Sequence, residues 1–281
     1  MTAATTQTSN RTEAKTPKLF KRLLVGIDRS PESLEAARQA AILAEDDAPI
    51  TLLSAWEAPA PTTSVLSALP WPGPELDVSG KAAEKAVSLA KRKLGRRRGL
   101  TAKIAFGVSW KKLIQEAGVE DATLIAIGSH GQGRMRGIMI GSTGTEVIHK
   151  AHCSVLVARR AGPSFPRRLV VGLDGSSESV AAFRVAEELA SRFGGEVRPI
   201  AAYGGIEADM EAVAQLVEHW EGTPDDAVYS LVAASADADL LVVGSRGLHG
   251  VRALGSVSER VAHQARCSTL IVRQGLEAGN D

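Results

Sequence analysis

The chain has 281 residues, which is enough for two domains of ordinary size or for one large one. Hydrophobic residues make up 44% and charged residues 23%, the balance of an ordinary globular protein, and the formal net charge of +1 gives no general attraction to nucleic acid or to anionic membranes. No apolar run approaches the roughly 20 residues that a membrane-spanning helix requires. Aromatic residues are only 4%, so the core has to be built from Val, Ile, Leu and Ala, which suits α/β layers.

The N-terminal segment is expected to be a disordered tail over residues 1–19. Met1–Lys18 is rich in Thr, Ala and charged residues and lacks the apolar segment of a secretory signal. The two cysteines, Cys153 and Cys267, do not indicate a disulfide framework, and each is expected to be a small buried side chain before a strand. Together these features predict a cytoplasmic protein.

Strands and helices alternate after the tail. The segment Arg22–Asp28 is an apolar strand that ends in a carboxylate, and Ser30 followed by Pro31 is typical of a helix start with Ser as its cap. Further along, apolar runs and helical spacing predict strands at 50–56, 102–106, 122–128 and 154–158, helices at 78–94, 110–117 and 142–150, and a proline-rich loop at 59–74.

The chain then repeats itself. The segments Arg168–Ser176, Leu240–Gly247 and Ala265–Val272 match Arg22–Ser30, Leu124–Gly131 and Ala151–Ala158, in that order. Three matching blocks in the same order indicate a duplicated domain. A short Gly/Pro linker near Arg160–Ser164 separates the copies, so we predict a first domain over 20–160 and a second over 166–275.

The second copy is shorter than the first. Gly128 follows Asp28 by 100 residues, whereas Gly244 follows Asp174 by 70. The missing residues correspond to the proline-rich loop and much of the helix after it. The glycine-rich loop is also shortened, with seven residues between Gly247 and Gly255 where the first copy has nine between the equivalent glycines.

Alternating strands and helices predict a parallel sheet with helices on both faces, and such sheets bind ligands beyond the carboxyl ends of their strands, where the strand order reverses. Asp28 ends the first strand and Gly128 ends the fourth. If these strands are neighbours, the carboxylate and the glycine-rich loop face one crevice. Ser142 and Thr143, three or four residues before Glu146, predict the cap of the helix that follows.

A strand, a glycine-rich loop and a helix start form a phosphate-binding arrangement, because glycine backbone can approach an anion and the helix N-terminus offers unpaired N–H groups. A carboxylate beside it could accept from a base amine or a ribose hydroxyl. The plainer interpretations are that Asp28 is a helix cap or turn acceptor and that the loop is a surface connection.

The pattern G-x2-G-x9-G-S/T, which Gly128, Gly131, Gly141 and Ser142 meet in full, resembles the ATP-binding motif of the universal stress proteins. Asp28 and the tandem arrangement resemble that family as well. The resemblance covers nearly the whole chain after the tail.

This resemblance implies two repeated doubly wound, Rossmann-like domains, each with a five-stranded parallel sheet of order 3-2-1-4-5, the second copy being trimmed. It implies that ATP binds with at most weak hydrolysis, and Mg²⁺ normally accompanies that nucleotide. By the same resemblance, Asp28 would lie by the adenosine and the end of the second strand near Ala55 would flank the adenine. The phosphates would be lined by Gly128, Gly131, Gly141 and Ser142, with Thr143 beside them. The different loop length puts the second-half equivalents in doubt as ligands, namely Gly244, Gly247, Gly255 and Ser256.

Other chemistries find less support. The sequence has no Walker A lysine pattern, and its G-x-G-x-x-G-like stretch is out of step and lacks the acidic residue that a dinucleotide site needs. His130 could touch a phosphate or act as an acid, but a solvated loop histidine is the simpler interpretation. Arg134 and Arg136 could neutralise phosphate charge. His149 and His152 near Cys153 do not form a convincing metal set, and we expect no metal beyond Mg²⁺.

The basic cluster Lys91–Arg98 lies near a predicted helix C-terminus, where cations are favoured, and it lacks the interleaved aromatics of a nucleic-acid site. The sequence therefore favours an ATP-binding regulator or adaptor in stress response, with ATP bound by the first half, and not a fast enzyme. Expected partners are ATP, a second copy of the chain in a homodimer and a protein that the sequence does not name, without nucleic acid or membrane. The alternatives are an assembly module without nucleotide, whose last strands pair between halves or chains, and a slow ATPase that uses His130.

Overall fold

The computed structural model describes residues 19–45, 47–57, 74–131, 140–204, 208–245 and 257–273, with only the backbone at 74–79 and 203–204. The first half runs β1 (Leu23–Gly26), α1 (Pro31–Leu43), β2 (Ile50–Trp56), α2 (Pro74–Leu94), β3 (Leu100–Phe106), α3 (Ser109–Val119), β4 (Leu124–Gly128), α4 (Ser142–Lys150) and β5 (Ser154–Ala158). The second half runs β6 (Arg168–Leu173), α5 (Ser177–Phe193), β7 (Glu196–Gly204), α6 (Met210–Leu216), β8 (Glu221–Asp226), α7 (Ala227–Ala234), β9 (Leu240–Gly244), α8 (Val257–Gln264) and β10 (Ser268–Val272). Residues 1–18 of the predicted tail and 59–73 of the predicted proline-rich loop lie outside the described residues, whereas Leu19 is buried and Pro74 already begins α2.

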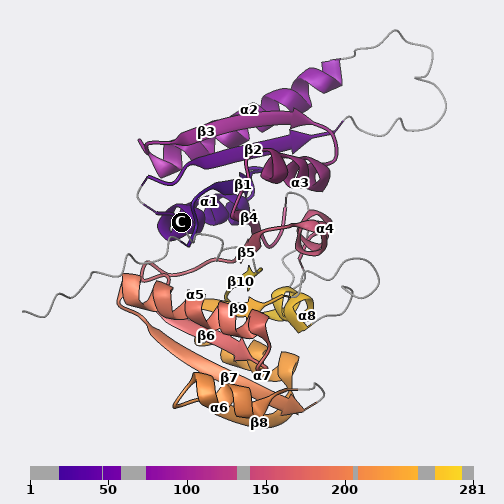
Figure 1. Ribbon diagram of the computed structural model, residues 1–281. Coiled ribbons are helices and arrows are strands. Elements are labelled where there is room, and N and C mark those ends of the chain that lie inside the picture. Colours follow the sequence, from indigo (N-terminus) through magenta and orange to yellow (C-terminus); the bar gives the residue numbers. More distant parts are fainter. Residues whose placement is uncertain are drawn as a thin grey trace, which may run out of the picture.

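The ten strands of the described residues form one sheet, in the order β3-β2-β1-β4-β5-β10-β9-β6-β7-β8. Each half has the predicted order 3-2-1-4-5, and its internal pairs are parallel. The halves meet where β5 pairs antiparallel with β10, with Leu156 opposite Leu270. Figure 1 shows the two halves one above the other with these strands at their junction. The pairing of the last strands, predicted as either between halves or between chains, therefore occurs within one chain.

The buried strands separate two apolar cores. One core lies under α1, α2, α5 and α6 and includes Leu43, Val87, Leu189 and Val213. The other lies under α3, α4, α7 and α8 and includes Leu113, Val147, Leu231 and Val261. Successive residues of a strand alternate between these cores, as in Leu23–Leu24–Val25, and this explains why the central strands are apolar throughout.

The second copy keeps all five strands although it is shorter. Its α6 has 7 residues where α2 has 21, which is where the sequence predicted the loss. The order 3-2-1-4-5 survives because β7 and β8 still pair in parallel. No helix of the described residues is long and apolar enough to cross a membrane.

Two arginines tie the halves together beside the β5–β10 pair. Arg159, just after β5, donates from Nη2 to the carbonyl oxygens of Ala262 (2.8 Å) and His263 (3.1 Å) at the end of α8. Arg273, its repeat equivalent after β10, donates to the carbonyl oxygens of Ile148 and Ala151 at the end of α4. Each half thus satisfies the C-terminal carbonyls of the last helix of the other half.

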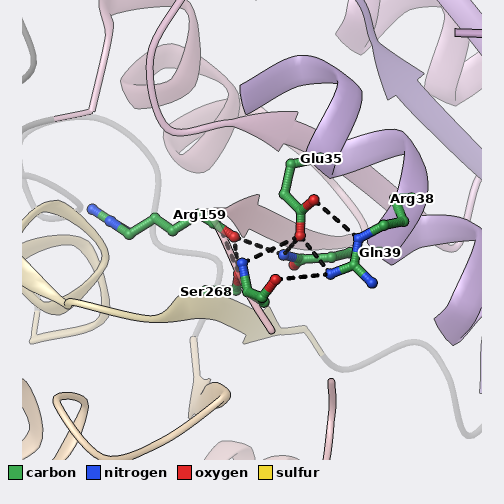
Figure 2. Close-up of polar contacts among 6 residues, drawn as sticks. Glu35, Arg38, Gln39, Arg159 and Ser268 are labelled. Carbon is green, nitrogen blue, oxygen red and sulfur yellow. Dashed lines mark hydrogen bonds and ion pairs between the residues drawn. The ribbon is translucent and has the colours of Figure 1, made fainter. Parts of the chain in front are cut away.

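Helix α1 is attached to the same junction (Figure 2). Gln39, fully buried, donates to the Arg159 carbonyl at 2.7 Å and to Glu35 Oε1 at 2.8 Å. Arg38 binds the Glu35 carboxylate through two nitrogens, at 2.6 and 3.0 Å. Burial raises the pKa of Glu35, but the hydrogen bonds from Arg38 and Gln39 outweigh that effect and hold it below its usual range. Ser268 of β10 both accepts from and donates to the Arg159 backbone, which completes the connection between α1 and the second half.

Candidate functional site

A cavity of about 290 Å³ opens at the carboxyl ends of β1 and β4 in the first half. These strands are neighbours, as the proposed crevice requires. All seven residues expected from the sequence line the cavity: Asp28, Ala55, Gly128, Gly131, Gly141, Ser142 and Thr143. Its volume is near the lower end of the roughly 300–1,000 Å³ typical of small-molecule sites.

The two carboxylate oxygens of Asp28 have different surroundings, one in a turn and the other at the cavity. Oδ1 accepts hydrogen bonds from the Ser30 hydroxyl at 2.6 Å and from the Ser30 N–H at 3.1 Å. Ser30, as predicted, caps α1, accepting from the Ser33 N–H. Oδ2 lies next to Gly131, since a Cβ added there would come within 2.6 Å of it. The turn-acceptor interpretation is therefore right for Oδ1, while Oδ2 lies at the loop that lines the cavity.

Gly128 is required by packing. A Cβ at this position would lie 2.7 Å from the backbone of Glu32 and Ser33, so β4 touches the first turn of α1 here. The second half repeats the contact, with a Cβ at Gly244 lying 2.4 Å from the Glu178 backbone. The first glycine of the motif therefore serves helix–strand packing in both copies.

Gly141 differs from the other motif glycines. A Cβ there would have nothing within 4 Å among the described atoms, and its φ of −67° and ψ of 163° are open to any residue. Neither its backbone conformation nor its packing against the described residues requires glycine at this edge of the cavity. Close approach of a ligand to the backbone would be a reason for glycine here.

Helix α4 begins without a capping side chain. The sequence predicted Ser142 and Thr143 as its cap, and this is wrong: Gly141 is the N-cap, Ser142 is already the first helical residue, and no side chain of the described residues accepts a capping hydrogen bond here. Glu146 instead lies 3.7 Å from Lys150 on the next turn. The helix start therefore faces the cavity with its N–H groups uncapped, where the helix dipole favours an anion.

His130 also lines the cavity. Its Nδ1 is 3.1 Å from Ser129 Oγ, and its carbonyl accepts from Ser30 Oγ at 3.3 Å. Its Nε2 is buried and has no hydrogen-bond partner in the described part of the chain. The prediction of a solvated side chain is therefore wrong. Arg134 and Arg136 lie outside the described residues.

The sequence reasoning missed several residues that line the cavity. Leu53 precedes Ala55 by two residues on β2, so both lie on the cavity face of the strand, and the alternation of the strand could have revealed it. Ser109 lies at the start of α3, another helix that begins at the carboxyl edge. Leu113 joins the apolar wall from the next turn of α3, which sequence spacing could not assign to this cavity.

The described residues of the second half repeat part of this arrangement. Asp174 Oδ1 accepts from the N–H of Ser176, as Asp28 does from Ser30, and Ser176 caps α5. The cavity here is about 80 Å³ and is lined by Asp174, Ala202 and Gly244, among others. The remaining motif equivalents, Gly247, Gly255 and Ser256, lie outside the described residues.

The two cysteines are not among the described residues that line the cavity. Cys153 and Cys267 are free and buried, as predicted, and burial raises the pKa of their thiols to about 11 and about 12. Among the described residues, no group of three or more His, Cys, Asp or Glu side chains is placed to hold a metal ion.

The fold and the cavity define a tandem doubly wound α/β protein with a ligand-site geometry at the switch point of its first sheet. The model of the Universal stress protein family matches residues 19–159 and 205–273, and the chain belongs to this family. A universal stress protein of Mycobacterium tuberculosis is 30% identical over 90% of this chain and 97% of its own length. One of Mycolicibacterium smegmatis is 31% identical over 89% and 96%.

Solved structures agree on the fold. A universal stress protein from Archaeoglobus fulgidus superposes with a TM-score of 0.67 at 20% identity, covering 90% of this chain and 96% of its own. A putative universal stress protein from Pseudomonas aeruginosa gives 0.66 at 16% identity, covering 92% and 95%.

Proposed function

We propose that this chain is an ATP-binding member of its family that acts as a nucleotide-dependent regulator or adaptor in stress response. The observation that carries the proposal is the uncapped start of α4 at the cavity, together with the open space at Gly141. A helix N-terminus without a capping side chain is suited to bind phosphate, and a glycine beside it lets an oxyanion reach the backbone.

The remaining residues fit an adenosine. Asp28 lines the cavity and its Oδ2 lies beside Gly131 of the loop, so this oxygen is placed to accept a hydrogen bond from a ribose hydroxyl or a base amine. Ala55 and Leu53 offer an apolar wall for the base. Ser142 and Thr143, in the first turn of α4, are placed to donate hydroxyl and N–H groups to phosphates. Mg²⁺ would then reach the site with the nucleotide.

Regulation is favoured over turnover because His130, the histidine among the described lining residues, is engaged within the protein: its Nδ1 contacts Ser129 Oγ and its carbonyl accepts from Ser30. A slow ATPase is the weaker alternative, and phosphate release unchanged in His130→Ala would remove it.

The binding experiment separates this proposal from an assembly module without nucleotide, whose predicted pairing between the halves is the β5–β10 pair. Denatured purified protein should release ATP, or the purified chain should bind it in calorimetry. Gly141→Asp places a carboxylate beside the uncapped helix start and should weaken ATP binding at least roughly tenfold.

Gly162→Asp is the matched control, because it adds the same charge where the nearest atom to a new Cβ is 4.0 Å away. It should bind ATP as the wild type does. Equal ATP affinity in the wild type and Gly141→Asp would show that the assigned site is wrong. No ATP in the extract and none bound on titration would favour the assembly module.

A further inference from the structure

One hydrogen bond joins the loop end of the first-half cavity to the second half. The N–H of Ile140 donates to Nδ1 of His263, in α8, at 3.2 Å across 123 residues of sequence. The next N–H, that of Gly141, donates to the Ser129 carbonyl at 3.0 Å within the first half. Two successive amides before α4 are thus each held, one of them by a side chain of the other copy.

His263 also reaches the first turn of α4. Its Nε2 lies 3.4 Å from Thr145 Oγ1, and Thr145 Oγ1 donates to the Gly141 carbonyl at 3.3 Å. A neutral imidazole with its proton on Nε2 satisfies both contacts, since Nδ1 then accepts from Ile140 and Nε2 donates to Thr145. The ring therefore spans the junction between the loop and the helix.

The electrostatic surroundings of His263 favour this neutral form. Burial lowers its pKa, and the charges of Arg159 and His149 lower it further, while Glu259 on the same helix opposes them. Glu259 Oε1 lies 4.0 Å from His263 Nε2 and 2.9 Å from Nε2 of His149 on α4.

The internal repeat relates the residues of this contact to one another. His149 is the repeat equivalent of His263, and Glu259 is the equivalent of Thr145. His149 faces Glu259 as His263 faces Thr145, and His263 in addition accepts from the N–H of Ile140, next to Gly141 at the edge of the first-half cavity. Ile140 is itself buried, and a Cβ at Gly144 would collide with its side chain. Because Ile140 packs against Gly144 of α4, a movement of the Ile140 amide also moves the start of this helix.

We propose that His263 is a positioning residue through which the second half sets the phosphate end of the first-half nucleotide site. The inference rests on the proposed function: by holding the Ile140 amide and the first turn of α4, His263 keeps the uncapped N–H groups aimed into the cavity. The second copy then acts as a regulatory partner of the first, and any event that moves α8 relative to α4 changes nucleotide affinity.

The test compares His263→Asn with His263→Gln in the full chain. Asn carries a carbonyl oxygen at the same number of bonds from the backbone as Nδ1 and can accept from Ile140, whereas Gln carries its amide one bond further out, near the place of Nε2. His149→Gln is the positional control, because it alters the same junction without touching Ile140. Affinities for ATP and for adenosine are measured by calorimetry, and exchange of the Ile140 amide proton is followed by NMR.

We expect His263→Gln to weaken ATP binding roughly three- to tenfold, the loss of about one hydrogen bond, and to leave adenosine binding unchanged. The Ile140 amide should exchange faster in this variant. His263→Asn should keep near wild-type ATP affinity and exchange, and His149→Gln should bind both ligands as the wild type does.

If the wild type binds ATP and His263→Gln binds it equally well, the inference is overturned while the proposed function stands. The same holds if adenosine binding falls as much as ATP binding, because the effect is then general. If the wild type binds no ATP, the proposed function fails. The exchange measurement then decides alone: faster exchange in His263→Gln supports the positioning role, and unchanged exchange overturns it.

Discussion

Gly131 lies against the carboxylate of Asp28, so closely that a Cβ on Gly131 would be 2.6 Å from Asp28 Oδ2. The two residues are far apart in the chain, one after β1 and the other after β4, and meet because these strands pair in parallel. The contact links the loop of the proposed nucleotide site to the group proposed to recognise the adenosine.

Gly131→Ala should therefore impair binding more than folding. The new methyl group forces Asp28 Oδ2 away, and Oδ1 cannot follow freely because the Ser30 hydrogen bonds hold it. We expect ATP affinity to fall roughly tenfold and the free energy of unfolding to change by less than about 1 kcal/mol, since Gly131 is exposed. Calorimetry and urea unfolding measure the two quantities. Gly162→Ala, at an open position, should change neither, and full ATP affinity in Gly131→Ala would argue against a role for Oδ2.

Asp28→Ala and Asp174→Ala form a matched pair. Each removes the acceptor for a serine N–H and hydroxyl in the same turn, so each should lower the free energy of unfolding by about 1–2 kcal/mol. Only Asp28→Ala should also reduce ATP affinity in calorimetry, because only Asp28 lines the larger cavity. An equal loss of ATP affinity in both variants would mean that the effect is general destabilisation.

The stability of the junction should depend on pH through His263. Its pKa in the folded protein is lowered by burial, so between the folded and the unfolded pKa the unfolded chain binds more protons. The free energy of unfolding should therefore be highest above the ordinary histidine pKa of about 6.5. It should decrease as the pH falls below that value and level off below the pKa of His263 in the folded protein. Urea unfolding from pH 8 to pH 5 measures this. His263→Asn, which does not titrate, should show a flatter profile, and an unchanged slope would assign the pH dependence to other groups.

Arg273→Leu should destabilise the chain by roughly 1–3 kcal/mol in urea unfolding. Arg273 is 6% exposed and donates to the carbonyls of Ile148 and Ala151, which would be left buried without this donor. Burial lowers the pKa of the Arg273 guanidinium, because the charged group loses contact with water. The variant avoids this desolvation cost, which offsets part of the lost free energy of unfolding. Arg160→Leu, at an exposed position, should stay within about 0.5 kcal/mol of the wild type. If Arg273→Leu did the same, its contacts would contribute nothing net to stability.

The fold could be predicted to a large extent because its signals are local or repeated. Apolar runs such as Leu124–Gly128 identify buried strands, and the three repeated blocks show that two copies share one topology. The meeting of Asp28 and Gly128 at one crevice follows from the order of parallel strands, and the structure confirms it.

The finer features could not be predicted, because they depend on exact backbone positions or on contacts between the halves. The cap of α4 was assigned to Ser142 and Thr143 from residue type, but a shift of one residue places Ser142 inside the helix. The reason for glycine at position 128 is the closeness of α1, which sequence spacing does not reveal. The contact between Ile140 and His263 spans 123 residues and depends on how β5 meets β10.

The joining of β5 to β10 within one chain also has a consequence for how the two copies can change over time. In an assembly of identical chains, any substitution at the junction appears on both sides at once. Here Arg159 and Arg273, or His149 and His263, are encoded separately, so one member of each pair can acquire a new task while the other keeps its place in the junction. Because the two halves are covalently linked, each first half, with its full-length glycine-rich loop, is paired with one second half, whose loop is shorter. Different roles of the two halves are therefore encoded in one chain, and the pairing of the halves does not depend on protein concentration.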